Sequence, residues 1–236
     1  MFTQSIKAAL AALRLLLKNW SALVLIVLLS GGLLFAGYLF VTTREATVWQ
    51  LVVTLSSIVI APLLFFALQS VSINYADDQG LKTRIKKIAG DSVRLIVVTV
   101  PLIVLTALAF YGLGKINSYS TVVVALRYLL AGVIAPLLAI QLWLTVSREG
   151  FRSVLRSVHH VTARAFTPQT VLVYGCGVLF FAVAPYLLIF RNMPIERAWL
   201  EASVLVLRLA ASALLILLGW VTTVGTLSIL SRPQQQ

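Results

Sequence analysis

The sequence contains little charge, and almost none of it is negative. Charged residues make up 11% of the 236 residues, and only seven are Asp or Glu. A typical soluble domain has about 25% charged residues. In contrast, 60% of the residues are apolar, which is more than a domain of this size can bury in one water-soluble core. This composition excludes a soluble enzyme and a disordered chain, and it predicts a polytopic membrane protein.

The side chains that usually carry catalysis or metal binding are also scarce. Cys176 is the single cysteine, so no intramolecular disulfide can form. The two histidines, His159 and His160, are adjacent and would point about 100° apart on a helix, unlike an i, i+4 metal-binding pair. We interpret Asp77 and Asp78 as helix-capping residues. No zinc-protease pair, phosphate-binding loop or nucleophile elbow occurs, so we expect no catalytic, metal or cofactor site and no enzymatic activity.

Long uncharged runs indicate six transmembrane helices. A helix needs about 20 apolar residues to cross the hydrocarbon layer, and the runs show no period-2 alternation that would indicate a barrel. Prolines at 62, 101, 136 and 185 predict kinks in four of the spans. The uncharged runs are 19–43, 46–76, 95–114, 128–147, 165–190 and 209–231, with apolar stretches 122–126 and 202–207 preceding the fourth and sixth. We therefore predict one all-α integral membrane domain over residues 1–236.

The net charge of +12 reports mainly on topology. Thirteen of the 19 Lys and Arg residues fall on one side of the predicted helices and four on the other. Basic loops stay in the cytoplasm, so both termini are expected there, in a multi-pass protein of a bacterial inner membrane. We expect the first span to serve as its own insertion signal. The positive charge therefore does not indicate a nucleic-acid partner.

Short matches indicate an internal repeat of helical hairpins. The segment Ile60–Leu64 recurs as Ile134–Leu138, 74 residues later. Tyr38, Tyr111 and Tyr186 have nearly the same spacing, close to the outer ends of successive spans. The alternative is that apolar helices share short words by chance. We interpret the pattern as three units, residues 1–78, 79–147 and 148–236, each a basic amphipathic segment followed by two helices.

The basic segments predict helices that lie at the cytoplasmic surface of the membrane. In the first, an apolar stripe opposes three basic residues: Ile6, Leu10, Leu13 and Leu17 against Lys7, Arg14 and Lys18. The third has a basic residue at every fourth position: Arg148, Arg152, Arg156, His160 and Arg164. These segments are either ordinary positive-inside anchors or a docking surface for an acidic partner or anionic lipid headgroups.

Two arginines lie inside or at the edge of predicted spans. Arg127 and Arg208 occupy similar positions in the fourth and sixth helices. A charge within a span is costly and often functional, so the pair is a possible binding site for an anionic solute or lipid. The alternative is that both side chains extend to the outer interface.

The entry to the first span carries a weak family resemblance. The segment Lys18-Asn19-Trp20 follows the basic amphipathic segment directly. In this the chain resembles bacterial six-helix membrane proteins, including the membrane domain found beside some glycerophosphodiester phosphodiesterases. The resemblance implies a six-helix bacterial membrane protein. We expect no phosphodiesterase activity from it, because these 236 residues include no phosphodiesterase domain.

Two function hypotheses follow. The first is an accessory or scaffold subunit that docks partner proteins or anionic lipid through its basic cytoplasmic helices. The second is a transporter-like protein that handles an anionic or lipid-like solute. A transporter usually places polar groups in several spans, and this chain has few, so the sequence favours the accessory role.

Overall fold

The computed structural model describes residues 2–43, 47–75, 81–116, 120–156, 158–191 and 197–231, with side chains described for all of these except 81–84, 116, 155 and 198. These residues are almost entirely helical. The elements are α1 (Phe2–Lys18), α2 (Trp20–Thr42), α3 (Val48–Asn74), α4 (Leu81–Ile116), α5 (Thr121–Leu129), the π-helical segment η1 (Leu130–Ile134), α6 (Ala135–Glu149), α7 (Phe151–Arg156), α8 (Val158–Ala165), α9 (Pro168–Val178), the π-helical segment η2 (Leu179–Val183), α10 (Ala184–Phe190) and α11 (Ala198–Leu230).

Six helical stretches are long and apolar enough to cross a membrane, which confirms the predicted number. They are Trp20–Thr42, Val48–Asn74, Ile85–Lys115, Thr121–Glu149, Pro168–Phe190 and Trp199–Leu230. Large apolar side chains on them are widely exposed; Val41, for example, is 81% exposed and Val48 is 80% exposed. Soluble proteins rarely expose apolar surface on this scale, whereas a bilayer stabilises it. The chain is therefore an all-α, multi-pass membrane protein.

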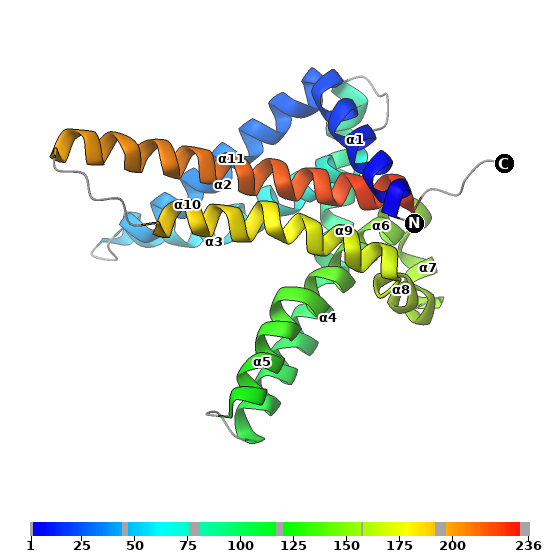
Figure 1. The fold of residues 1–236 in the computed structure, drawn as a ribbon. Helices are drawn as coiled ribbons and strands as arrows, with labels where there is room; N and C mark the ends of the chain where they lie inside the picture. Colours follow the sequence, from blue (N-terminus) through cyan, green and yellow to red (C-terminus); the bar gives the residue numbers. More distant parts are fainter. Residues whose placement is uncertain are drawn as a thin grey trace.

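The helices form two arms that meet at one end of the molecule. Hairpins α2–α3 and α9–α10–α11 lie together in one arm, and the hairpin of α4 with α5 diverges as the other (Figure 1). Helix α1, the end of α11 and the short helices α7 and α8 lie near the junction (Figure 1). We call this the basic end, because Lys7, Arg14, Arg148 and Arg152 lie on its elements.

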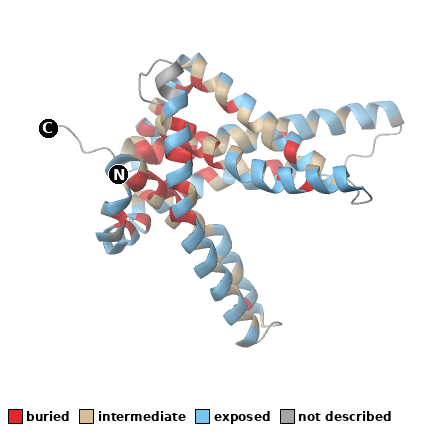
Figure 2. Cartoon of the chain, turned by 180° about the vertical axis from the view of Figure 1, so that it is seen from behind, coloured by how far each residue is buried: buried red, intermediate tan, exposed pale blue. Residues whose placement is uncertain are grey.

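The tightly packed core lies where the arms meet, and the arms themselves are mostly exposed (Figure 2). Trp143 of α6 is 4% exposed and packs edge-on against Phe65 and Phe66 of α3, with ring centroids 6.2 and 6.1 Å apart. Such aromatic pairs add about 0.5–1.5 kcal/mol each beyond the area they bury. The junction therefore holds the arms together, while their outer parts diverge.

Two of the four prolines within the predicted spans follow π-helical segments. Pro136 and Pro185 both come two residues after such a segment ends, at η1 and η2. Proline lacks an N–H and clashes with the carbonyl four residues earlier, and a wider π turn accommodates that lost bond. Pro62 and Pro101 lie inside the continuous helices α3 and α4.

The entry segment Lys18-Asn19-Trp20 has a clear structural role. The Asn19 side chain caps α2 by accepting a hydrogen bond from the Ala22 N–H, and its Nδ2 donates to the Tyr75 carbonyl at 2.9 Å. The Tyr75 hydroxyl in turn donates to the Ala12 carbonyl in α1 at 3.1 Å. These contacts join the start of α2 and the middle of α1 to the end of α3.

Helix α1 packs on the protein through a face that the sequence did not single out. Its buried residues are Ser5, Ala8, Ala12 and Leu16, and its main neighbour is α11. Small side chains allow two helices to approach closely. The predicted apolar stripe is instead exposed, from 39% at Leu13 to 59% at Leu17. An exposed apolar stripe beside basic residues is typical of a helix at a membrane surface.

The three basic segments are not alike in structure. The first is a separate helix, α1, whereas the second is continuous with the 36-residue helix α4. The third is divided between α7 and α8. The division of the chain into repeats at 1–78, 79–147 and 148–236 stays a prediction.

Candidate functional site

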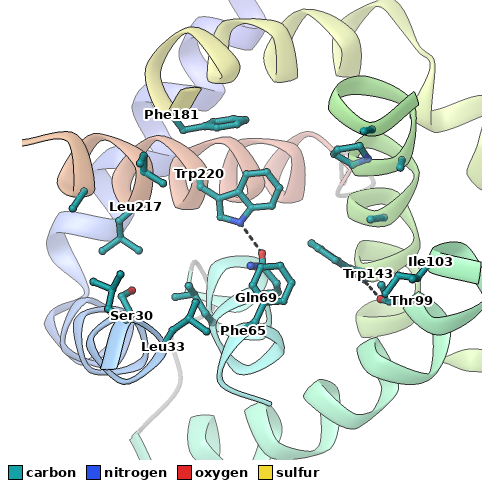
Figure 3. Close-up of a pocket in the computed structure, with 18 of the residues that line it drawn as sticks. Ser30, Leu33, Phe65, Gln69, Thr99, Ile103, Trp143, Phe181, Leu217 and Trp220 are labelled. Atoms are coloured by element: carbon teal, nitrogen blue, oxygen red, sulfur yellow. Dashed lines mark hydrogen bonds between the residues drawn. The ribbon is translucent and has the colours of Figure 1, made fainter. Parts of the chain in front are cut away.

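A large cavity lies between the helices of the two arms. Its volume is about 1070 Å³, at the upper end of the 300–1,000 Å³ that is usual for small-molecule sites. Helices α2, α3, α4, α6 and α11 all contribute to its walls, together with η1 and η2. Figure 3 shows side chains from these helices converging on the cavity. The α4–α5 hairpin diverges from the other arm (Figure 1), and α4 and η1 line the cavity opposite α2 and α11.

The cavity walls are apolar, and of the described residues that form them none is charged. The apolar side chains that line it include Leu33, Phe65, Ile103, Phe110, Phe181 and Leu217. Alanines line it on η1, α4, α6 and α11, where their small side chains leave space: Ala107, Ala131, Ala135, Ala139, Ala210 and Ala213. This lining suits a hydrocarbon chain and disfavours a free ion, since an unpaired charge in an apolar site is strongly destabilised.

Apart from Ser30 and Thr106, whose hydroxyls donate to carbonyls of their own helices, the polar groups in the cavity wall form two tryptophan pairs. The Trp220 Nε1–H donates to Gln69 Oε1 at 2.8 Å, and the Trp143 Nε1–H donates to Thr99 Oγ1 at 2.8 Å (Figure 3). The Thr99 hydroxyl is also satisfied, because it donates to the Leu95 carbonyl at 2.6 Å. The polar side-chain groups of Trp143 and Thr99 therefore all have hydrogen-bond partners within the protein.

The Gln69 carboxamide, in contrast, has a group without a hydrogen-bond partner. Gln69 is fully buried, and its Nε2 has no hydrogen-bond partner among the described residues. An indole N–H can only donate, so the atom facing Trp220 must be Oε1, and the amide cannot be turned to satisfy both ends. Leaving a buried donor unpaired costs about 1–3 kcal/mol. Such an atom at a cavity wall calls for an explanation.

Aromatic rings surround this part of the cavity. Phe181 lies edge-on to Trp220 with centroids 5.3 Å apart, and Phe65 lies edge-on to Trp143 at 6.2 Å. All four rings line the cavity with Gln69 (Figure 3). They come from α3, α6, η2 and α11, so the site exists only once these segments have packed together.

Asp91 is the centre of a buried polar cluster and was not among the predicted site residues. It is 5% exposed, and its Oδ2 accepts from Asn74 Nδ2 at 3.2 Å and from Ser147 Oγ at 3.1 Å. These contacts join α4, α3 and α6 at the basic end. Asp91 does not line the cavity. One signal could have revealed it: Asp91 is the one acidic residue in the otherwise basic segment 79–94 that precedes the third predicted span.

Arg127 and Arg208 each contact the first helix of their own hairpin. Arg208 Nη1 donates at 2.7 Å to the carbonyl of Arg191, the residue that directly follows α10. The Arg127 guanidinium lies over Gly114 of α4, where an added Cβ would be 2.5 Å from Nη2. Neither arginine lines the cavity. Their predicted role in binding an anion or lipid stays a prediction, and the structure places them at two separate positions.

The predicted basic ladder does not occupy one continuous helix. Arg148 is in α6, which ends at Gly150 with a φ of +83°, a left-handed conformation that favours glycine. Arg148 is exposed, and its guanidinium is held against the end of α11, where Nη1 donates to Ser231 Oγ at 2.6 Å and Nη2 donates to Ser228 Oγ at 2.9 Å. The remaining members lie exposed on α7 and α8: Arg152, Arg156, His160 and Arg164.

Other residues considered in the sequence have simple placements. His159 and His160 are exposed, and no cluster of three or more His, Cys, Asp or Glu side chains suited to a metal occurs among the described residues. Arg164 is 3.6 Å from Glu149 in an exposed ion pair, which stabilises the fold little. Asp77 and Asp78 lie outside the described residues.

No protein-family model, curated protein or solved structure matches this chain. The resemblance to the phosphodiesterase-associated membrane domain therefore stays a prediction, and the cavity supports the functional argument by its own chemistry.

Proposed function

We propose that this chain is a non-enzymatic membrane protein that binds a lipid-like molecule in the cavity between its two arms. The observation that carries this proposal is the cavity itself: about 1070 Å³, with apolar walls and a few polar groups at fixed positions. Cavities of this kind are the usual sites for hydrophobic ligands. The sequence favoured an accessory role because polar groups within the spans were few. A hydrophobic ligand does not need many polar groups. The cavity therefore favours the other hypothesis, a transporter-like protein that handles a lipid-like solute.

Selectivity in such a site must come from shape and from its polar groups. Lipid tails are as apolar as the cavity walls, so the hydrophobic effect does not draw a lipid from the bilayer into the cavity. Close packing against the rings and the hydrogen bonds at the wall supply the preference. The cavity therefore supports recognition of a particular lipid more than general solvation by the bilayer.

We also propose that the basic end faces the cytoplasm of a bacterial cell, as the distribution of Lys and Arg predicts. Gln69 lies five residues before the end of α3, about 7.5 Å along the helix axis at 1.5 Å per residue. The polar part of the cavity then lies toward the cytoplasmic leaflet, where a ligand could enter with its head at that depth.

The test is lipid retention after gentle extraction. Ala107 and Ala213 line the cavity and are exposed, so the double variant Ala107→Trp/Ala213→Trp partly fills it and obstructs a ligand without disturbing the core. Ala109 and Ala202 are equally exposed but do not line the cavity, and Ala109→Trp/Ala202→Trp is the matched control. Native mass spectrometry should show a bound lipid in the wild type and the control, and none in the filled variant. Equal lipid retention in all three proteins would refute the proposal.

A docking function is the second candidate, favoured by the exposed cations of α7 and α8. Arg152, Arg156 and His160 are exposed and could contact an acidic protein or anionic headgroups. Double replacement, Arg152→Glu/Arg156→Glu, should remove any co-purifying acidic protein. Arg197→Glu, an exposed arginine at the start of α11, is the control. A protein that co-purifies equally with both variants does not dock on α7 and α8.

A further inference from the structure

We infer that the cavity selects a neutral lipid whose head carries a carbonyl oxygen, and that Gln69 Nε2 donates the hydrogen bond that recognises it. This inference rests on the proposed lipid-binding function and adds the chemical class of the ligand. The two possible sources of such an oxygen are an ester, as in a diacylglycerol, and a ring carbonyl, as in an alkylated quinone.

The hydrogen-bond donor Gln69 Nε2 has no partner among the described residues. Trp220 holds Oε1 of Gln69 at 2.8 Å, which fixes the amide orientation and leaves both protons of Nε2 without a partner among the described residues. The other polar pair in the wall, Trp143 with Thr99, has no unpaired member. The Ser30 and Thr106 hydroxyls, which also line the cavity, donate to the Ile26 and Leu102 carbonyls. Gln69 Nε2 is therefore the one side-chain donor without a partner among the described lining residues, and its natural complement is an acceptor oxygen.

The absence of charge in the wall decides that the ligand is neutral. None of the described lining residues is Asp, Glu, Lys, Arg or His. The nearby charges are engaged elsewhere: Asp91 with Asn74 and Ser147, and Arg148 with Ser228 and Ser231. A phosphate or carboxylate head would be desolvated beside a single neutral donor, which is unfavourable. A neutral carbonyl oxygen, in contrast, can be satisfied by one hydrogen bond from that donor.

The placement of Gln69 also orients the ligand. The cavity extends along α4 from Thr99 to Phe110, about 16 Å at 1.5 Å per residue. Gln69 is near the basic end, while Phe110 is close to the far end of α4. A lipid with its head at Gln69 would extend its tail toward Phe110. Because the carboxamide has no exposed surface, the flanking rings must shift when the ligand binds, and tryptophan fluorescence reports that shift.

The experiment uses quenching of the two cavity tryptophans by brominated lipids. Trp20, Trp49 and Trp199 are 72%, 74% and 64% exposed, so replacing them with Phe leaves Trp143 and Trp220 as reporters. The probes share chain length: brominated diacylglycerol, brominated phosphatidic acid and a brominated alkane. Unlabelled alkylated benzoquinone competes against the diacylglycerol to distinguish the two carbonyl sources.

The decisive variant is Gln69→Met, which retains length and a weak acceptor for Trp220 but no donor. We expect the reporter protein to bind diacylglycerol about tenfold more tightly than the alkane, the factor given by 1.4 kcal/mol, and more tightly than phosphatidic acid. In Gln69→Met the carbonyl preference should fall to about one, with alkane binding unchanged. Thr106→Val, which removes a lining hydroxyl that donates to the Leu102 carbonyl of its own helix and leaves no side-chain donor unpaired, should leave the preference intact.

Several outcomes would overturn the inference while the proposed function survives. These are an unchanged carbonyl preference in Gln69→Met, equal losses for diacylglycerol and alkane, or a reporter protein that binds the alkane as tightly as the diacylglycerol. The comparison of alkane with diacylglycerol uses the reporter protein with Gln69 intact. It therefore tests the inference even if Gln69→Met does not fold. If no probe quenches and the cavity-filled protein behaves identically, the proposed function itself fails.

Discussion

Replacing Gly225 with alanine should destabilise the fold strongly, because Tyr75 occupies the space that a side chain would need. A Cβ on Gly225 would lie 2.5 Å from the Cε1 and Cζ atoms of the Tyr75 ring. Tyr75 is 1% exposed and is held by its hydroxyl bond to the Ala12 carbonyl and by Asn19 at its own carbonyl. The ring has no free space into which it can move, so α11 must separate from α3 or the ring must leave its site.

The expected cost follows from three contributions. Overpacking a tight core costs about 1–3 kcal/mol. Losing the Tyr75–Ala12 bond leaves a buried hydroxyl unpaired, which costs about 1–3 kcal/mol. The higher helix propensity of alanine offsets about 0.5–1 kcal/mol of this loss in the free energy of unfolding. The free energy of unfolding should therefore fall by about 3 kcal/mol, measured by reversible SDS unfolding in mixed micelles.

Two controls separate this clash from a general effect of alanine. Gly90→Ala and Gly112→Ala place a Cβ in open space, so both should leave stability unchanged or raise it by about 0.5–1 kcal/mol. In a Tyr75→Leu background, Gly225→Ala should cost little, because the ring that it meets is gone. The reasoning would be refuted if Gly225→Ala unfolds like the wild type, or if its cost is the same in both backgrounds.

Three further predictions follow from other contacts. Burial raises the pKa of Tyr75, so its contribution to stability is complete below pH about 10, its usual pKa, and declines at higher pH; SDS unfolding of Tyr75→Phe should lack that alkaline decline. Asp91→Ala leaves Asn74 and Ser147 without their shared acceptor and should cost about 2–4 kcal/mol, with Asp91→Asn milder, and equal stability of Asp91→Ala and wild type in SDS unfolding would refute it. Arg127→Leu with Arg208→Leu should leave diacylglycerol quenching unchanged, because neither arginine lines the cavity, and a loss of quenching would restore their predicted ligand-binding role.

The membrane architecture could be predicted from the sequence with little ambiguity. Each span is a run of about 20 or more residues without charge, and a helix is the simplest way to satisfy its backbone in lipid. The predicted number of spans was confirmed, and the predicted runs overlap the observed helices closely. Hydrophobicity and length act locally along the chain, so they can be read without knowing which helices are neighbours.

Only the tertiary structure identified the cavity, the unpaired donor of Gln69 and the polar centre at Asp91. A transmembrane helix is apolar on every face, so no periodic pattern shows which side packs on protein and which on lipid. Gln69 is one polar residue in α3, and its significance depends on Trp220, which is 151 residues away in sequence. The splayed α4–α5 hairpin likewise follows from long-range packing at the junction, where the rings of α3 and α6 meet.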